Sequence, residues 1–218
     1  MVTVGDDVSA VEVDLVAGRI GCSECGGRLR PWGSARPRRV RVELEGGQGV
    51  SSHRPRRGRC EGCGVTHVLL AVSLAARRAD AASVIASAVE AKVVKGWGHR
   101  RVAAALGRPA STVRGWLRSF TASAEAIAAT FAALIVRDAP DAAAVWPAPN
   151  RAAGARALAV LAAYATAVAQ RFGIGTLAWV RAGIAATNGW LFTSVRWASR
   201  GQHQPALTST SWWPSGSR

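Results

Sequence analysis

The N-terminal third of the chain carries the pattern of half-buried strands, which is period-two alternation of apolar and polar residues or a short apolar run between turns. The segments VEVDLV (11–16), RRVRVELEGG (38–47) and THVLLAV (66–72) show it, and the second of them ends in a glycine turn. We therefore expect short strands within residues 11–72.

The apolar spacing changes to three and four residues after about residue 80, which predicts helices. The sequence GWG at 96–98 ends a first helix, a second begins near His99, and a third begins near Ala110. The apolar stripe of the first helix is Val84, Ile85, Ala88, Val89 and Val93.

Residues 121–197 are rich in alanine and predict further helices, interrupted by the Pro-containing linker DAPDAAAVWPAPN. We expect helices over 151–172 and 176–190 after this linker. Two Ala-rich stretches, 157–170 and 174–192, do not qualify as membrane spans, because the first is too short and Arg181 interrupts the second. The stripe before the linker is Ile127, Phe131, Leu134 and Ile135.

The tail from about residue 198 is rich in Ser, Thr and Pro, a composition that predicts disorder. Trp212 and Trp213 are unusual in such a tail, and we interpret them as docking residues for this protein or a partner.

The four cysteines of the chain form two Cys-x-x-Cys pairs, each followed by glycine. Two such turns supply the four thiolates of a tetrahedral zinc site, and a closed shell of four sulfurs indicates a structural role for Zn2+. The alternative is a pair of disulfides or free thiols. His53 and His67 lie near the second pair and could replace a ligand, or be ordinary strand or surface residues. The expected ligands are Cys22, Cys25, Cys60 and Cys63.

The resulting fold class is α+β and mainly α overall. We expect a β zinc ribbon with short strands at 1–72, a three-helix domain at 80–120 and an Ala-rich helical bundle at 121–197, followed by the tail at 198–218. The helices of 121–197 are candidates for partner docking or homodimer formation, since alanine supplies little buried area per residue.

The formal net charge of +15 and a pI near 11.6 predict a polyanionic partner, most often nucleic acid and sometimes an anionic membrane. Arginine carries most of this charge, which in part reflects GC-rich codon usage. The acidic N-terminal segment lacks a secretory signal pattern, and thiols that bind zinc suit a reducing compartment. We therefore expect a cytoplasmic, nucleoid-associated protein and no membrane partner.

The segment GHRRVAAALGRPASTVRGWLRSF (98–120) has the spacing of two helices that cross at a tight turn. Ala103 is the small residue at the crossing and Gly107 opens the turn, while Pro109 stands where a capping Ser or Thr is common. This segment resembles the helix-turn-helix of bacterial regulators and transposases. The residues expected to face inward are Val102, Leu106, Val113, Trp116, Leu117 and Phe120.

The resemblance implies that the second helix of the motif enters the major groove of double-stranded DNA. Its outer face carries Ser111, Thr112, Arg114, Gly115 and Arg118, and the arginine fork suits guanine O6 and N7. The alternative is a solvated basic face used for protein contact. The residues expected to hold phosphates are Arg100, Arg101 and Arg108, with Arg38, Arg39, Arg54, Arg56, Arg57 and Arg59 from the runs RPRR and RPRRGR.

The order of the two motifs, over about residues 20–120, resembles the N-terminal DNA-binding region of insertion-sequence transposases. No acidic residue follows Asp141, so the three carboxylates of a two-metal transposase core are missing and we expect no enzyme. The resemblance implies a zinc-dependent, sequence-specific DNA binder that serves a mobile element beside a separately encoded transposase. The alternatives are a transcriptional regulator of host genes, a protein-interaction adaptor and, less favoured, an RNA binder.

Overall fold

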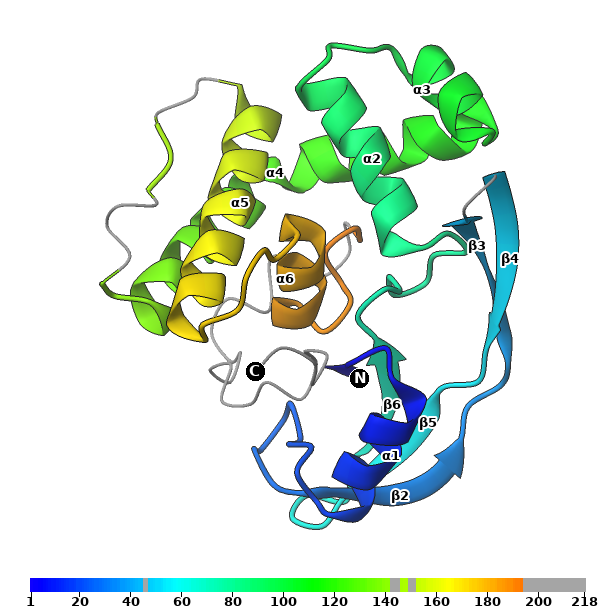
Figure 1. Cartoon of the computed structure of the whole chain (residues 1–218), viewed down its shortest axis with the longest axis vertical. Coiled ribbons are helices and arrows are strands. Elements are labelled where there is room, and N and C mark those ends of the chain that lie inside the picture. The colour runs from blue at the N-terminus through cyan, green and yellow to red at the C-terminus, as the bar shows by residue number, and fades with distance from the viewer. Residues whose placement is uncertain (45–46, 142–145, 149–151, 194–218) are drawn as a thin grey trace. The chain divides into compact units, whose positions relative to one another are not determined.

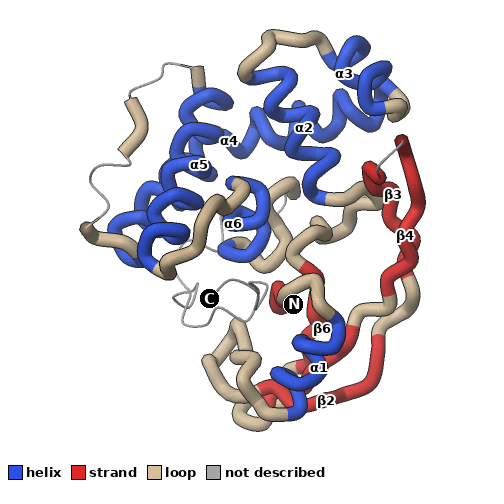
Figure 2. Tube along the Cα trace, viewed as in Figure 1, coloured by secondary structure: helices blue, strands red, loops and turns tan. Residues whose placement is uncertain are grey.

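The computed structural model describes residues 1–44, 47–141, 146–148 and 152–193, and over these residues it is a mixed α and β structure, mostly helical, with six helices (Figures 1 and 2). The chain divides into two compact units. Within the described part, the first unit is residues 1–81 and 184–191, and the second is residues 82–183 and 192–193. The predicted fold class is confirmed at this level, whereas the tail from residue 198 lies outside the described residues.

The first unit contains a four-stranded sheet and a separate two-stranded hairpin. The sheet order is β1-β6-β5-β2, in which β1 runs parallel to β6 and the other pairs are antiparallel. The strands are β1 (Val2–Val4), β2 (Leu29–Ser34), β5 (Arg56–Cys60) and β6 (Thr66–Ala71) in the sheet, with β3 (Arg38–Leu44) and β4 (Gly47–His53) in the hairpin. The strands predicted in RRVRVELEGG and THVLLAV are confirmed.

The strand predicted for residues 11–16 is wrong, because this segment belongs to the helix α1 (Val8–Val16). The Asp7 side chain caps the helix by accepting hydrogen bonds from the Ser9 and Ala10 N–H groups, at 2.8 and 3.1 Å. Val11 and Leu15, four residues apart, are the buried face, while Val13 is 60% exposed. The cap and this spacing outweigh the strand preference of the valines.

Helix α1 packs on one face of the sheet and encloses the core of the first unit there. Leu15 and Leu29 are fully buried. Gly58 of β5 lies between them, since a Cβ at this position would be 3.1 Å from the Leu29 Cβ and 3.2 Å from the Leu15 Cδ1. The other core residues are Val2, Val4, Val11, Ile20, Cys22, Cys60 and Leu69.

A C-terminal segment, Ile184–Leu191, completes the first unit, which the sequence did not predict. Asn188 Oδ1 accepts a hydrogen bond from Thr3 N at 3.2 Å, and Gly189 O accepts one from Ala76 N at 2.8 Å. Gly189 has a φ of 84° and a Cβ there would lie 2.6 Å from the Leu70 Cδ2. The position therefore requires glycine for both its backbone and its packing.

The second unit consists of helices whose starts agree closely with the predicted ones. They are α2 (Ala82–Val93), α3 (His99–Leu106), α4 (Ala110–Asp138), α5 (Ala153–Arg171) and α6 (Trp179–Ala186), the last of which continues into the first unit. Helix α4 runs without a break through residue 120, where a domain boundary was expected. Its buried side joins Val113 and Trp116 to Phe131 and Ile135, so one helix serves both predicted regions.

Two of the described helices, α4 and α5, are long and apolar enough to cross a membrane by length and composition alone. The most apolar 18-residue windows are 44% and 50% buried within the folded protein. Core helices of soluble proteins meet the same criterion, so this is weak evidence for a membrane location.

A buried polar cluster joins the end of α4 to α5. The Tyr164 hydroxyl donates a hydrogen bond to Asp138 Oδ2 at 3.1 Å, and Arg137 binds the same carboxylate through two nitrogens at 2.6 and 2.9 Å. Burial, with the charge of Asp138, raises the pKa of Tyr164, which keeps the phenol protonated as a donor. The Tyr164 ring also packs edge-on against Phe131 at 5.2 Å.

Replacing Tyr164 with Phe keeps the ring contact but removes one donor from a buried carboxylate. We expect the free energy of unfolding to fall by about 1–3 kcal/mol, measured by urea denaturation. Thr166→Val is the control, because Thr166 on the same helix is exposed. A Tyr164→Phe protein as stable as the parent would contradict a stabilising role for this hydrogen bond.

Candidate metal centre and nucleic-acid interface

Two turns of the same design bring the four cysteines together in the first unit. The first leads from α1 into β2 and the second joins β5 to β6. The glycine that follows the second cysteine of each turn, Gly26 or Gly64, has a positive φ (74° and 72°). Its N–H donates to the carbonyl of the first cysteine, at 2.9 Å in the first turn and 3.0 Å in the second. This backbone conformation explains why a glycine follows each pair.

Strand pairing sets the two turns against each other. Leu29 pairs with Cys60 between β2 and β5, and Glu61 N donates to Arg28 O at 3.0 Å. The end of the first turn therefore lies beside the start of the second. This register is what converts two pairs of cysteines, far apart in the sequence, into one cluster.

The four Sγ atoms all lie within 4.8 Å of one another, a geometry that could hold a metal ion such as zinc. Cys22 Sγ and Cys63 Sγ are 3.7 Å apart, and Cys25 Sγ and Cys60 Sγ are 3.5 Å apart. Zinc–sulfur bonds of about 2.3 Å place tetrahedral ligands roughly 3.8 Å apart, close to these values. A disulfide would need about 2.05 Å, so the sulfurs are not bonded to each other.

Backbone amides face the sulfurs, and at Cys60 they favour the thiolate form. The Cys63 N–H, aided by that of Gly62, lowers the pKa of Cys60 to about 7, whereas burial raises the pKa of Cys22. Gly27 closes the cluster from the side, because a Cβ there would stand 3.0 Å from the Cys60 Sγ. The turns thus place four soft sulfur ligands together, and a side chain at position 27 would press on the Cys60 sulfur.

His67 lies beside the cluster as a hydrogen-bonding partner and is outside the four-ligand set. Its ring is 1% exposed, with Nε2 3.2 Å from Cys22 Sγ and Nδ1 2.9 Å from the Met1 nitrogen. In the tautomer with the ring hydrogen on Nε2, this hydrogen points to the Cys22 sulfur and Nδ1 accepts from the Met1 nitrogen. Burial lowers the pKa of His67, in keeping with a neutral ring.

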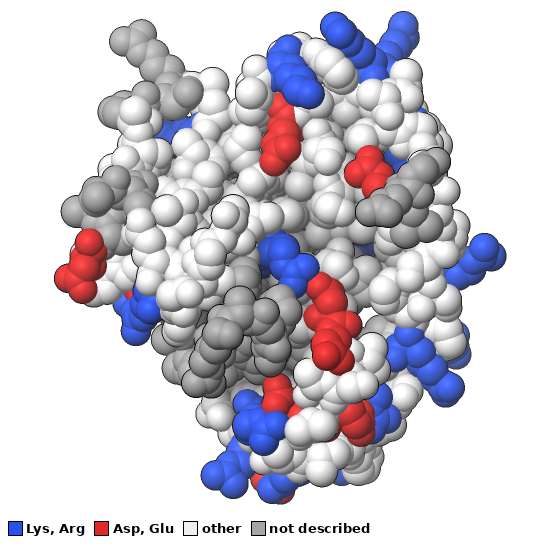
Figure 3. All heavy atoms as spheres, viewed as in Figure 1, with Lys and Arg blue, Asp and Glu red and all other residues white. Residues whose placement is uncertain are grey.

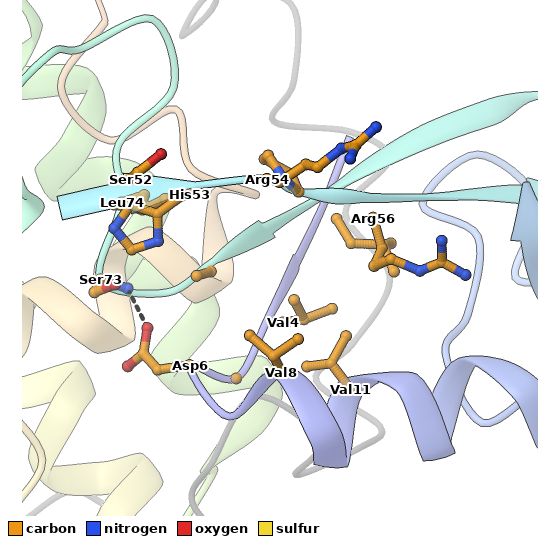
Figure 4. A pocket seen from close by; sticks show the side chains of 14 residues that line it. Val4, Asp6, Val8, Val11, Ser52, His53, Arg54, Arg56, Ser73 and Leu74 are labelled. Atoms are coloured by element: carbon orange, nitrogen blue, oxygen red, sulfur yellow. Dashed lines mark hydrogen bonds between the residues drawn. The ribbon is translucent and has the colours of Figure 1, made fainter. Parts of the chain in front are cut away.

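His53 does not join the metal cluster. It lines a cavity of about 180 Å³ between α1 and the sheet, near Asp6 and Ser73 (Figure 4). The Asp6 carboxylate there accepts a hydrogen bond from Ser73 N at 3.1 Å. The sequence alternative in which His53 replaces a cysteine ligand therefore has no geometric support.

In the second unit, α3 and α4 are joined by a short turn and bury the apolar residues expected to face inward. Gly107 is in the left-handed conformation with a φ of 54°, and its N–H caps α3. Pro109 precedes α4 and makes no side-chain cap. Leu106 is only half-buried. The buried residues are Val102, Ala103, Val113, Trp116, Leu117 and Phe120.

The opposite side of the start of α4 is exposed and basic. Ser111, Arg114, Gly115 and Arg118 are exposed, while Thr112 is half-buried. No carboxylate occurs in the sequence between Glu90 and Glu125. Figure 3 shows Lys and Arg side chains projecting from the end of the second unit that carries α3. The residues of α3 and of the first four turns of α4 therefore offer an anion no carboxylate of their own.

A tryptophan not singled out from the sequence organises part of this basic surface. The Arg101 guanidinium lies 4.2 Å from the centre of the Trp97 ring, and the Lys95 ammonium lies 5.0 Å from it. Such cation–π contacts fix the direction of long side chains. The GWG sequence signalled only a helix end, because contact with a residue in the next helix cannot be read from spacing.

Arg108 differs from the prediction that it holds a phosphate. It is only 6% exposed, and its Nη1 lies 3.3 Å from Leu106 O and 3.4 Å from Gly107 O. Its side chain therefore folds back over the carbonyls at the end of α3, where a cation is favoured by the helix dipole.

The arginines of the two runs in the first unit likewise include side chains that bind within the protein and side chains that are exposed. Arg56 binds Glu12 through two nitrogens at 2.7 and 2.9 Å, and the half-buried Arg38 donates to backbone carbonyls of Ala75 and Arg78. These two side chains serve the fold. The members of the runs that remain exposed are Arg36, Arg39, Arg54, Arg57 and Arg59.

Replacing Cys60 with Ser should abolish metal binding and unfold the first unit, because metal-binding energy at a four-thiolate site is folding energy. We expect loss of amide-exchange protection in β2, β5 and β6, with α5 still protected, and loss of bound metal measured by elemental analysis. Ser23→Ala, next to Cys22, is the control. A Cys60→Ser protein whose strands stay protected without metal would disprove a structural metal.

Replacing His67 with Phe should weaken metal binding about 10- to 100-fold, since partners of a ligand commonly contribute this much. Competition against a chromophoric chelator measures the affinity. His67→Gln can keep an N–H near the Cys22 sulfur and should lose less. Equal affinities for the parent and both variants would show that the hydrogen bond does not tune the site.

Comparison with protein-family models, with characterised proteins and with solved structures finds no match for this chain.

Proposed function

We propose that the protein binds double-stranded DNA and reads its sequence through the start of α4. The observation that carries this proposal is that Arg114 and Arg118 are exposed one helical turn apart, while the opposite side of the start of α4 is buried. A helix with basic residues on one side and buried apolar residues on the other can enter a groove of DNA without exposing its apolar side. We take α3 and α4 as a DNA-binding helix-turn-helix on this basis.

In this reading the arginine forks contact base edges in the major groove, where guanine offers two acceptors. Gly115 stands between them and lets the backbone approach closely, while Ser111 is placed for a base or a phosphate. Arg100 and Arg101 lie on α3 and are exposed, so they would contact phosphates and set the orientation on the duplex.

The first unit would add affinity without sequence preference. Arg39, Arg54, Arg57 and Arg59 are exposed and can contact phosphates, and such contacts weaken steeply as salt rises. Zinc is the ion we propose for the cysteine cluster, because four thiolates at tetrahedral spacing suit it. With all four positions taken by sulfur, its role is to hold β2 and β5 together.

The biological setting rests on the resemblance alone. An accessory DNA binder of a mobile element and a regulator of host genes would use the same DNA chemistry.

Replacing Arg114 or Arg118 with Ala should lower the preference for the specific site by about 1–3 kcal/mol each, the value of one arginine contact to guanine. The measurement is the ratio of two affinities, one for a duplex that the protein selects from a random DNA pool and one for a duplex with the same bases in scrambled order. Arg19→Ala is the control, because it removes the same charge from an exposed side chain that pairs with Asp14. An unchanged ratio in both variants would favour the adaptor interpretation.

A further inference from the structure

The sheet of the first unit has two faces of opposite character. Along β5, the residues Arg56, Gly58 and Cys60 face α1 and the core, whereas Arg57 and Arg59 face the other way and are exposed. Strand β6 alternates in step, since Thr66 pairs with Arg59 and Val68 pairs with Arg57, and both are half-buried. The face opposite α1 thus combines two arginines with two partly accessible strand residues.

An exposed tryptophan lies at the β2 side of this face. Trp32 is 52% exposed, although tryptophan is among the side chains that gain most from burial. The Arg59 guanidinium lies 4.7 Å from the centre of its ring, and Arg59 Nε donates to Gly64 O at 3.3 Å. One side of the indole is therefore held by a fixed cation while much of the ring remains accessible.

The neighbouring Arg30 is already occupied. It binds Glu61 at 2.8 Å and donates to Val16 O at 2.9 Å. Arg57 and Arg59 are two exposed cations of this face, one on each side of Gly58. Their alternate positions on one strand lie about 7 Å apart, so the two side chains can reach different phosphates of one strand.

We propose that Trp32, Arg57 and Arg59 form a binding site for single-stranded nucleic acid. An indole can stack on a base only when the base is not enclosed within a duplex, and flat sheet faces that combine an aromatic ring with arginines suit this purpose. The duplex has its bases covered and offers Trp32 nothing to stack on. This site lies in the other unit from α4. It shares Arg57 and Arg59 with the phosphate contacts proposed for the duplex, and Trp32 is the residue that serves single strands alone.

The test measures binding of the full-length, zinc-loaded protein to a fluorescent oligothymidylate of about 16 nucleotides, a length that one small module can cover. The same assay uses an oligouridylate, which distinguishes DNA from RNA, and a duplex of equal length. The variants are Trp32→Ala, Trp32→Phe and Trp146→Ala. Trp146 is the matched control, since it is also 52% exposed and belongs to the second unit.

We expect Trp32→Ala to weaken single-strand binding about tenfold, with Trp32→Phe retaining part of the affinity because it keeps a ring for stacking. Binding to the duplex and the zinc content should stay unchanged, and Trp146→Ala should match the parent. Equal single-strand affinity in Trp32→Ala and the parent would overturn the proposal. An equal loss on single strands and duplex would also overturn it, because it would mark a general effect of charge or folding. These comparisons between Trp32 and Trp146 variants do not require α4 to read sequence, so they test the single-strand site even if the proposed function of α4 is wrong.

Discussion

The meeting of four cysteine sulfurs is the constraint on which the first unit depends. Each Cys-x-x-Cys turn is local, but the cluster exists only because β2 and β5 pair with Leu29 opposite Cys60. The apolar core around it is small and includes Cys22 and Cys60 themselves. A metal ion bound there would supply folding energy that such a core lacks, and would fix the sheet whose opposite face carries Trp32 and Arg59.

The second unit is stabilised differently. A long α4 packs its apolar side against the neighbouring helices, and the one charged group buried at its end, Asp138, is satisfied by Arg137 and Tyr164. Because the inner face is closed in this way, Arg114 and Arg118 can remain on the outside for a ligand. The proposed division of labour follows, with sequence reading by the helical unit and phosphate or single-strand contacts by the unit that carries the cysteine cluster.

Features set by local spacing were predictable from the sequence, and features set by distant contacts were not. The cysteine cluster and the starts of α3 and α4 follow from motifs and from 3.6-residue periodicity. Helix α1 was predicted as a strand, because VEVDLV alternates while its decisive cap, Asp7, lies outside the pattern. The burial of Arg108, the contact of His67 with Cys22, and the return of Ile184–Leu191 to the first unit all depend on tertiary neighbours.

The most direct test of the account is selection of bound duplexes from a random DNA pool by the zinc-loaded protein at near-physiological salt. We predict enrichment of a defined motif, because exposed arginines on a helix that enters the major groove discriminate among bases. Retention of DNA without enrichment would contradict the account. It would mean that the net charge of +15 attracts phosphates alone and that α4 does not read sequence.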